Sequence, residues 1–314
     1  PPSRIDKFNA KVGKLNEWMT AQSEVFSSGE YGANLVSTET LITAYEAFET
    51  QLAQQQQTVE TVTAWAATEG IETHEQCAAT QTALAEVQAT LAAIVEQGTT
   101  YRLYLEMTRE SHEKFGKLDE VAAWIAKKQE FFASGQYGEA LVDTNALLEQ
   151  FQAWPTQLAP QVETVESMTS EQEAITERVA AEQASLDALR ESAETYHAYL
   201  LCQQEYFEKM ATLETLAGWI NGQSAIFAAE DYGDDLASTN NNLSLFNETF
   251  KVAYPAKREA LDAMETYQDE IQAQIDAKKA DMDALQEQAD YYENQLLLAQ
   301  ERFEKLPLLS RVEA

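Results

Sequence analysis

The pattern Trp-x12-Tyr-Gly-x2-Leu occurs three times in this 314-residue chain, and no other sequence feature restricts its fold as strongly. Its tryptophans are Trp18, Trp124 and Trp219, which are 106 and 95 residues apart. A pattern that returns at a nearly constant spacing indicates an internal repeat, in which each copy folds as the same unit. The sequence therefore predicts three similar units in tandem.

Apolar residues recur at fixed offsets around each tryptophan. At about 100° per residue, these offsets fall on one side of a helix, so each tryptophan is predicted to lie near the middle of a broad buried stripe. The positions six and three before the tryptophan, and one, seven and eight after it, are Val12, Leu118 and Leu213; Leu15, Val121 and Leu216; Met19, Ile125 and Ile220; Val25, Phe131 and Ile226; and Phe26, Phe132 and Phe227.

Two further helical runs follow each tryptophan-bearing run. The second run carries an aromatic residue fourteen positions after the tyrosine, namely Tyr45, Phe151 or Phe246. The third run alternates apolar spacings of three and four, which is typical of helices packed at coiled-coil angles. Each unit is therefore predicted to be a three-helix bundle, with the three tryptophans, Phe26, Phe132, Phe227 and these three aromatics as its core. The third-run residues are Leu84, Val87, Leu91, Ile94, Tyr101 and Leu105; Ile175, Val179, Leu186, Leu189, Ala193, Tyr196 and Leu200; and Ile271, Ile275, Met282, Leu285, Ala289, Tyr292, Leu296, Phe303 and Leu306.

The units are predicted to be joined by continuous helices, because no proline interrupts the pattern from 84 to 132 or from 175 to 227. Such junctions would stack the units end to end as a semi-rigid rod on the order of 150 Å long. We expect repeats at residues 1–110, 111–205 and 206–306, followed by a C-terminal connector at 307–314. Breaks between second and third helices are predicted near Gly70, at 167–170 and near Thr266. Pro155, Pro160 and Pro255 are predicted to kink the second helices or open them locally.

Each Tyr-Gly pair is predicted to form the corner between the first two helices, with the tyrosine covering the end of the bundle. Gly29 and Gly135 suit a helix C-terminus that needs a left-handed residue, whereas Glu230 occupies that position in the third copy. The turn residues are Tyr31, Gly32, Tyr137, Gly138, Tyr232 and Gly233.

The chain is strongly acidic, with 53 acidic and 21 basic residues and a formal net charge of -32. This charge argues against binding to nucleic acid or to anionic membranes. The basic residues Arg4, Lys7, Lys11 and Lys14 are concentrated in the first helical run. Two distant cysteines and the lack of a long apolar run predict a cytoplasmic protein without a membrane span.

Candidate chemical sites are weak. The segment "EDYGDD" groups acidic residues but lacks the ligand register of an EF-hand loop, so we interpret it as a solvated corner. His74 and Cys77 offer only half of a zinc site, and His112 and His197 are isolated. The tryptophan and phenylalanine stripes lack the interleaved basic residues of a nucleic-acid platform. We therefore expect no enzymatic activity, cofactor or metal.

A repeat of about 100 residues with an early tryptophan, a Gly-x-x-Leu turn and continuous inter-repeat helices resembles the spectrin repeat. The stretch "YEAFETQLAQQQQTVETVTAWAATE", Tyr45 to Glu69, is similar to the middle helix of an α-actinin rod repeat, with Tyr45 where histidine is common. The resemblance implies a cytoskeletal rod that forms an antiparallel homodimer. It also implies a parent protein with actin-binding calponin-homology domains before Pro1 and EF-hands after Ala314.

These observations predict a structural spacer and dimerisation region of an α-actinin-like protein that crosslinks actin filaments. The basic first helix would lie near the acidic third repeat of an antiparallel partner. The alternative is a monomeric spectrin-repeat scaffold segment that binds other cytoskeletal or adaptor proteins. A calcium sensor or an enzyme is a weaker alternative.

Overall fold

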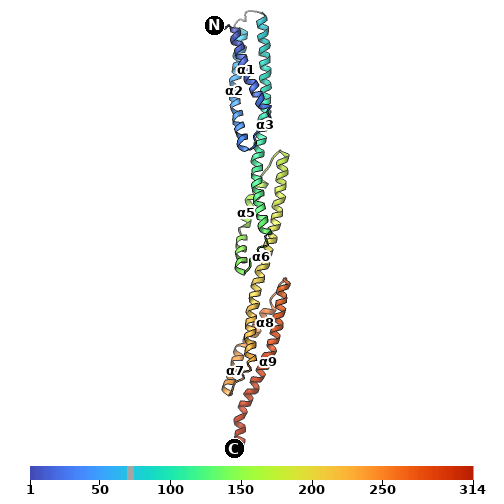
Figure 1. The fold of residues 1–314 in the computed structure, drawn as a ribbon. Helices are drawn as coiled ribbons and strands as arrows, with labels where there is room; N and C mark the ends of the chain where they lie inside the picture. Colours follow the sequence, from blue (N-terminus) through green and yellow to red (C-terminus); the bar gives the residue numbers. More distant parts are fainter. Residues whose placement is uncertain (69–73, 314) are drawn as a thin grey trace. The chain divides into compact units, whose positions relative to one another are not determined.

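A computed structural model of the chain describes residues 1–68 and 74–313 (Figure 1). Those residues form nine α-helices and no strand, which confirms the all-α class. The helices are α1 (Arg4–Phe26), α2 (Leu35–Thr68), α3 (His74–Ala133), α4 (Leu141–Phe151), α5 (Trp154–Glu166), α6 (Glu173–Ala228), α7 (Leu236–Glu248), α8 (Phe250–Asp262) and α9 (Asp269–Val312).

Two of these helices are long enough to serve successive bundles. α3 has 60 residues and α6 has 56, so the third helix of one bundle continues as the first helix of the next, as predicted. The breaks predicted at 167–170 and near Thr266 are present between α5 and α6 and between α8 and α9. The break predicted near Gly70 lies outside the described residues.

The chain divides into two compact units, residues 1–130 with 157–190 and residues 131–156 with 191–314. Each unit holds a complete three-helix bundle; the first unit also contains most of α5 with the start of α6, and the second also contains α4.

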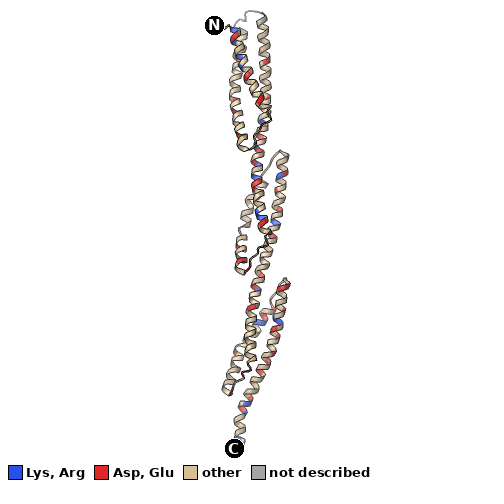
Figure 2. Cartoon of the chain, in the orientation of Figure 1, with Lys and Arg blue, Asp and Glu red and all other residues tan. Residues whose placement is uncertain are grey.

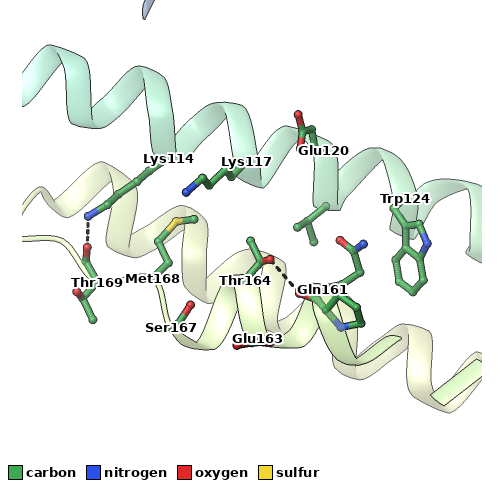
Figure 3. Close-up of a pocket in the computed structure, with 12 residues that line it drawn as sticks. Lys114, Lys117, Glu120, Trp124, Gln161, Glu163, Thr164, Ser167, Met168 and Thr169 are labelled. Carbon is green, nitrogen blue, oxygen red and sulfur yellow. Dashed lines mark hydrogen bonds between the residues drawn. The ribbon is translucent and has the colours of Figure 1, made fainter. Parts of the chain in front are cut away.

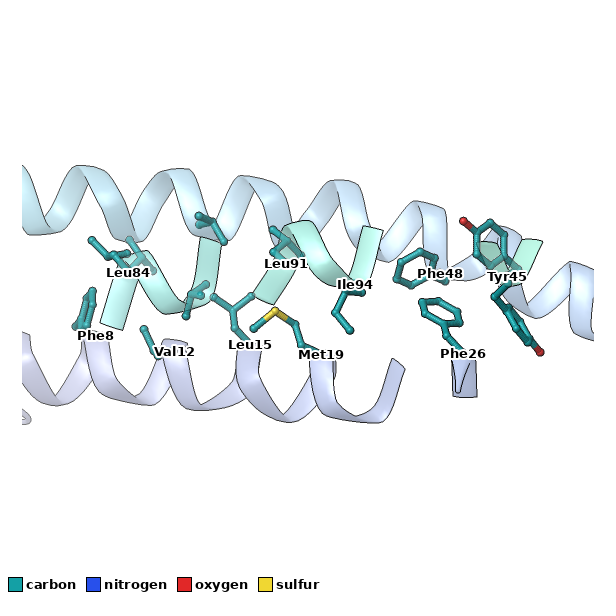
Figure 4. Packing of buried hydrophobic residues seen from close by; sticks show 14 of the residues in the cluster. Phe8, Val12, Leu15, Met19, Phe26, Tyr45, Phe48, Leu84, Leu91 and Ile94 are labelled. Carbon is teal, nitrogen blue, oxygen red and sulfur yellow. The ribbon is translucent and has the colours of Figure 1, made fainter. Parts of the chain in front are cut away.

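The first bundle consists of α1, α2 and the N-terminal half of α3. Its core is a row of apolar side chains that begins at Phe8 and ends in a cluster of aromatic rings around Phe26 (Figure 4). The T-shaped contact between Phe26 and Phe48, with ring centroids 4.8 Å apart, and the tilted contact between Phe26 and Tyr45 belong to this cluster. Leu15 and Met19, both predicted to face the core, are almost completely buried.

The third bundle, in the second unit, consists of the C-terminal part of α6 with α7, α8 and α9. α9 lies against both α7 and α8 (Figure 1). Leu213 and Phe227 from α6 pack with Phe246 from α7 and with the α9 seam that begins at Ile271. The seam predicted for α9 is buried as far as Leu296, but Leu306 is exposed, and its assignment to the seam was wrong because no described helix packs there.

The position of the tryptophans on their helices differs from the prediction. Trp18, Trp124 and Trp219 are half-buried rather than central to the core. The buried offsets of -6, -3, +1 and +8 cluster on one side of the helix, and the tryptophan lies at the edge of that cluster. For the same reason the +7 column was predicted wrongly: Val25, Phe131 and Ile226 are 45%, 40% and 52% exposed.

The second helix is continuous in the bundle where it contains no proline and broken in the two bundles where it contains proline. α2 contains no proline and runs uninterrupted, whereas its counterparts are split into α4 and α5 and into α7 and α8. Pro155 is the second residue of α5, where a missing N–H costs little, and Pro160 and Pro255 lie inside α5 and α8. The predicted openings therefore exist, but they precede the prolines.

The break at Thr249 also absorbs one extra residue. Trp154 follows its corner tyrosine by 17 positions, whereas the corresponding Phe250 follows by 18. Both aromatic side chains are buried, and so are Val165 and Leu261, each eleven residues further on. The break thus keeps the later apolar residues of the second helix facing the core.

Candidate functional site: bundle corners and polar clamps

Each corner between the first two helices is closed by a buried threonine that sequence reasoning missed. The Oγ1 atoms of Thr38, Thr144 and Thr239 donate hydrogen bonds to the carbonyl oxygens of Tyr31, Tyr137 and Tyr232, at 2.8, 2.7 and 2.8 Å. All three threonines are completely buried. The signal was present in the sequence, because each threonine follows its tyrosine by seven residues.

The corner glycines are required for two separate reasons. Gly32, Gly138 and Gly233 have φ values of 98°, 95° and 90°, which side-chain-bearing L-residues rarely adopt. A Cβ atom at Gly32 would also lie 2.3 Å from Thr38 Oγ1, and one at Gly138 would lie 2.5 Å from Thr144 Oγ1. The threonine therefore occupies the space that a side chain at Gly32 or Gly138 would need.

A tyrosine of the third helix ties each corner to the rest of its bundle. The hydroxyls of Tyr101, Tyr196 and Tyr292 donate to the carbonyl oxygens of residues 30, 136 and 231 at 3.2, 3.1 and 3.0 Å. Burial is the main cause that raises the pKa of all three phenols. Each corner tyrosine packs its ring on this buried one, with centroids 5.6 to 5.7 Å apart, and so covers the end of the bundle.

A left-handed residue follows the first helix of each bundle, two or three residues after the helix ends. Gly29 and Gly135 have φ values of 71° and 70°, and Glu230 has a φ of 52° in the third copy. The third corner therefore adopts the same backbone with a residue that disfavours it.

The acidic side chains of the third corner serve as local caps. Asp235 is the N-cap of α7 and accepts a hydrogen bond from the backbone N–H of Ser238 at 2.7 Å. This bond is the largest cause that lowers the pKa of Asp235. Asp231 accepts from the backbone N–H of Gly233 at 3.1 Å. Two of the acidic side chains in this corner thus accept hydrogen bonds within the turn itself.

A polar clamp ties the turn between α5 and α6 to α3. Glu110 on α3 accepts from Lys114 Nζ at 2.6 Å and from Gln172 Nε2 at 2.7 Å. The same Gln172 nitrogen donates to the carbonyl oxygen of Met107 at 2.9 Å, and Lys114 also donates to the carbonyl oxygen of Thr169 (Figure 3). The hydrogen bond from Lys114 is the largest cause that lowers the pKa of Glu110 to about 2.

The same clamp recurs at the start of the third bundle. Glu205 on α6 accepts from Lys209 Nζ and Gln268 Nε2, both at 2.6 Å, and Gln268 donates to the carbonyl oxygen of Cys202 at 2.9 Å. Lys209 also donates to the carbonyl oxygen of Glu265. The hydrogen bond from Lys209 is the largest cause that lowers the pKa of Glu205.

Sequence reasoning missed both clamps, although each leaves a signature in the sequence. The helix side reads Glu-x2-Glu-Lys in "ESHEK" and "EYFEK", and the turn side reads Met-x-Ser/Thr-x-Gln in "MTSEQ" and "METYQ". The first bundle lacks the clamp residues: Arg4 and Phe8 stand where the later bundles have glutamate and lysine.

An open groove of about 870 Å³ lies between α3 and α5 in the first unit (Figure 3). Lys114 and Lys117 line it together with Glu120 and Glu163, so these charges balance, and the half-buried Trp124 forms part of one wall. No histidine or cysteine is among the described residues that line the groove. It offers an open contact surface of mixed polar and apolar character.

The histidines have structural contacts where they are described. His112 Nε2 lies 3.1 Å from the carbonyl oxygen of Gly32, and the His197 ring stacks on Phe151 with centroids 4.6 Å apart. The side chain of His74 lies outside the described part of the chain, so its pairing with Cys77 stays untested. Among the described residues, no three His, Cys, Asp or Glu side chains gather as metal ligands.

The basic residues of the first helix lie along one face of α1. Their spacing of three, four and three residues follows the helix period. Lys11 is half-buried, with its ammonium 5.3 Å from the centroid of the Trp65 ring, whereas Arg4, Lys7 and Lys14 are exposed. Figure 2 shows basic residues on α1, whereas the 34-residue α2 contains none.

Within residues 1–68 and 74–313, no helix combines the length and apolar character needed to span a bilayer. The bundles, the closed corners and the clamps at their junctions define a class of protein: a tandem helical-repeat protein whose recurring polar contacts serve structure. Such a fold is not typical of enzymes.

Comparison with known proteins identifies the repeat. The spectrin repeat family model matches residues 3–106 and 109–196, and the chain belongs to this family. The chain is 22% identical over 240 residues to the erythrocytic spectrin beta chain of Mus musculus, a match that covers 71% of this chain and 11% of that protein. The chain thus spans about a tenth of that relative's length. Its role is that of a structural repeat protein of cytoskeletal type.

Proposed function

We propose that the chain is the spacer and dimerisation region of an α-actinin-like protein that crosslinks actin filaments, and that it acts as an antiparallel homodimer. In such a dimer a semi-rigid rod sets the distance between binding domains at its two ends, which this chain itself does not contain. Actin is bound by those domains. The continuous helices α3 and α6 support a spacer role, because a continuous helix bends less readily than a flexible linker.

The observation that carries the antiparallel arrangement is the uneven distribution of charge. Residues 206–306 contain 20 acidic and 8 basic side chains, whereas α1 presents a basic face. Full antiparallel overlap would bring the basic face of one copy to the acidic third repeat of its partner at both ends. Parallel overlap would instead oppose like-charged repeats along the whole length.

Exposed apolar side chains at the two junctions supply a contact surface for the partner. Leu103, Tyr104 and Met107 on α3 and Tyr199 and Leu201 on α6 are all more than a third exposed. Apolar area of this kind is a common component of stable interfaces between copies of a chain.

Mass and orientation can be tested in one experiment. Light scattering at micromolar concentration should give twice the 35.1 kDa chain mass. A Cys77→Ser, Met107→Cys variant keeps the exposed Cys202 as its other thiol. In full antiparallel overlap, residue 107 of one copy lies beside residue 202 of the other, so oxidised glutathione should trap a covalent dimer.

The matched control adds Cys202→Ser to the same variant, which should abolish the antiparallel crosslink. A parallel dimer would give 107–107 crosslinks that survive in this control, and a monomeric mass would reject the dimer altogether.

A monomeric scaffold is the second candidate. The acidic corner of the third bundle favours it, because a small open groove there is lined by three acidic side chains and one basic side chain, which leaves a negative surface that suits a basic partner segment. These residues are Glu230, Asp231, Asp234 and Arg302. A monomeric mass together with salt-sensitive binding of a poly-lysine probe, lost in an Asp231→Asn, Asp234→Asn variant, would support this alternative.

A further inference from the structure

The helix signature of the polar clamp occurs a third time, at the C-terminal end of α9. The segment "ERFEK" spans residues 301–305 and matches "ESHEK" and "EYFEK". Its glutamate, Glu301, follows the buried Tyr292 by nine residues, as Glu110 follows Tyr101 and Glu205 follows Tyr196. The third copy therefore stands in the same register as the two clamps.

The third copy makes only the part of the clamp that one helix can make. Lys305 and Glu301 form an ion pair within α9, with 64% and 55% of their side chains exposed. In the clamp on α3, Lys114 and Glu110 are 27% and 31% exposed, because the turn with Gln172 covers them. No described turn occupies the corresponding place at α9.

The residues that follow the signature repeat the core positions of a first helix. Leu309 corresponds to Leu118 and Leu213, four residues after the clamp lysine, and both of those are buried. Leu309 and Val312 are instead 61% and 85% exposed. This end of α9 thus has both the charged pair of a clamp and the apolar core positions of a first helix.

We infer that residues 301–312 of α9 form an acceptor surface for the second and third helices of a further spectrin-type bundle. The incoming turn carries a glutamine, which donates to Glu301 and to the carbonyl oxygen of Leu298, and a backbone carbonyl that accepts from Lys305. The incoming helices cover Leu309 and Val312. At α3 and at α6, the equivalent glutamate and lysine already bind a glutamine and a backbone carbonyl of this kind.

A second copy of this chain does not supply this turn. Gln172 and Gln268 are both engaged in their own clamps, and the equivalent position of the first bundle, 24 residues before the buried tyrosine, is Cys77. The occupant is therefore a helix pair with its own glutamine-bearing turn.

In the test, a second copy of the chain's own middle-bundle segment is fused to the C-terminal end of α9 and serves as the probe. Residues 122–205 are fused after Val312, so that Leu309 and Val312 take the places of Leu118 and Val121. Hydrogen exchange of the amides in 301–312 should slow roughly a hundredfold or more as this stretch becomes part of a bundle. Changing the grafted Gln172→Ala should reverse part of that protection.

The matched control inserts one alanine between Val312 and the graft, which turns the graft by about 100° relative to the acceptor face. The inference is overturned if exchange is unchanged in the in-register fusion, or if the shifted fusion is protected equally. It is also overturned if the chain without a graft self-associates and Glu301→Arg abolishes that association, because the surface would then belong to a second copy.

Discussion

At the scale of single residues, the corner between the first two helices is specified by a few side chains whose roles follow from backbone geometry. The glycine of each Tyr-Gly pair provides a φ near 95° and a close approach to the following threonine. The threonine hydroxyl then satisfies a carbonyl oxygen inside a closed corner, where an unpaired group would be costly. The recurrence of the pair in the sequence thus reflects a steric requirement.

Replacing Gly138 with alanine should destabilise the protein by about 2 kcal/mol or more, because the residue has a φ of 95° and its new Cβ would lie 2.5 Å from Thr144. Urea unfolding followed by circular dichroism measures the change. Gly116 is the matched control: it lies within α3, and an added methyl group would meet nothing within 4 Å, so Gly116→Ala should stabilise by up to ~1 kcal/mol. Equal effects at the two glycines would contradict the steric explanation.

The left-handed Glu230 gives an opposite prediction. Glu230→Gly should stabilise the third bundle by about 0.5 to 1 kcal/mol, since glycine adopts a φ of 52° without the Cβ penalty. Glu230→Gln keeps the side-chain size and the strained backbone, so it serves as the control and should leave the urea midpoint nearly unchanged. If the glutamine variant is stabilised as much as the glycine variant, charge rather than backbone strain limits this corner.

At the scale of helices, the polar clamps fix where a turn meets the helix that enters its bundle. Glu110 gains charge-assisted hydrogen bonds only in the folded state, so its pKa falls from 4.5 to about 2. A depressed carboxyl pKa contributes stability above the unfolded pKa, and this contribution disappears as the pH falls from about 4.5 toward 2. The clamp is therefore complete at neutral pH.

Removing the glutamine of the clamp should weaken the turn between α5 and α6. Gln172→Ala should cost about 1 kcal/mol at pH 7, and hydrogen exchange near residues 167–172 should accelerate. Glu110→Gln removes the group that titrates. The free energy of unfolding of this variant should therefore fall less than that of the wild type as the pH is lowered from about 4.5 to about 2. Gln183, which lies further along α6 and donates to Asp187 of the same helix at 3.5 Å, provides the control, and Gln183→Ala should change neither measurement.

The helices show which features a single sequence can reveal. The long helices α3 and α6 and the turns near 167–170 and Thr266 were predictable, because hydrophobic period and helix breakers act within a short window. The clamps were not found, because Glu110 and Gln172 are 62 residues apart and their bond depends on how three helices pack. Thr144 was missed for a related reason: a polar residue on a helix is expected at the surface, and only the corner geometry requires it to be buried.

At the scale of the whole molecule, the negative net charge opposes self-association. The uneven distribution of charge along the chain can still favour one arrangement of two copies over another. A chain with a formal net charge of -32 repels its own copies, so any dimer must place the few basic faces opposite acidic ones. The basic face of α1 is the clearest such element. Lys11 is partly committed to the Trp65 ring, which leaves Lys7 and Lys14 as the exposed lysines of this face.

Reversing these two charges should weaken an antiparallel dimer without unfolding it. A Lys7→Glu, Lys14→Glu variant should raise the dimer dissociation constant roughly tenfold or more at low salt, because two attractive contacts at each end become repulsive. Sedimentation equilibrium at about 0.05 M and about 0.5 M salt measures both affinities, and the difference between variant and wild type should shrink at high salt as screening increases. The Lys7→Arg, Lys14→Arg variant keeps the charge and should dimerise as the wild type does. A dissociation constant that is the same for all three proteins at low salt would show that the basic face of α1 takes no part in the contact, and the apolar junction residues would then have to account for any association.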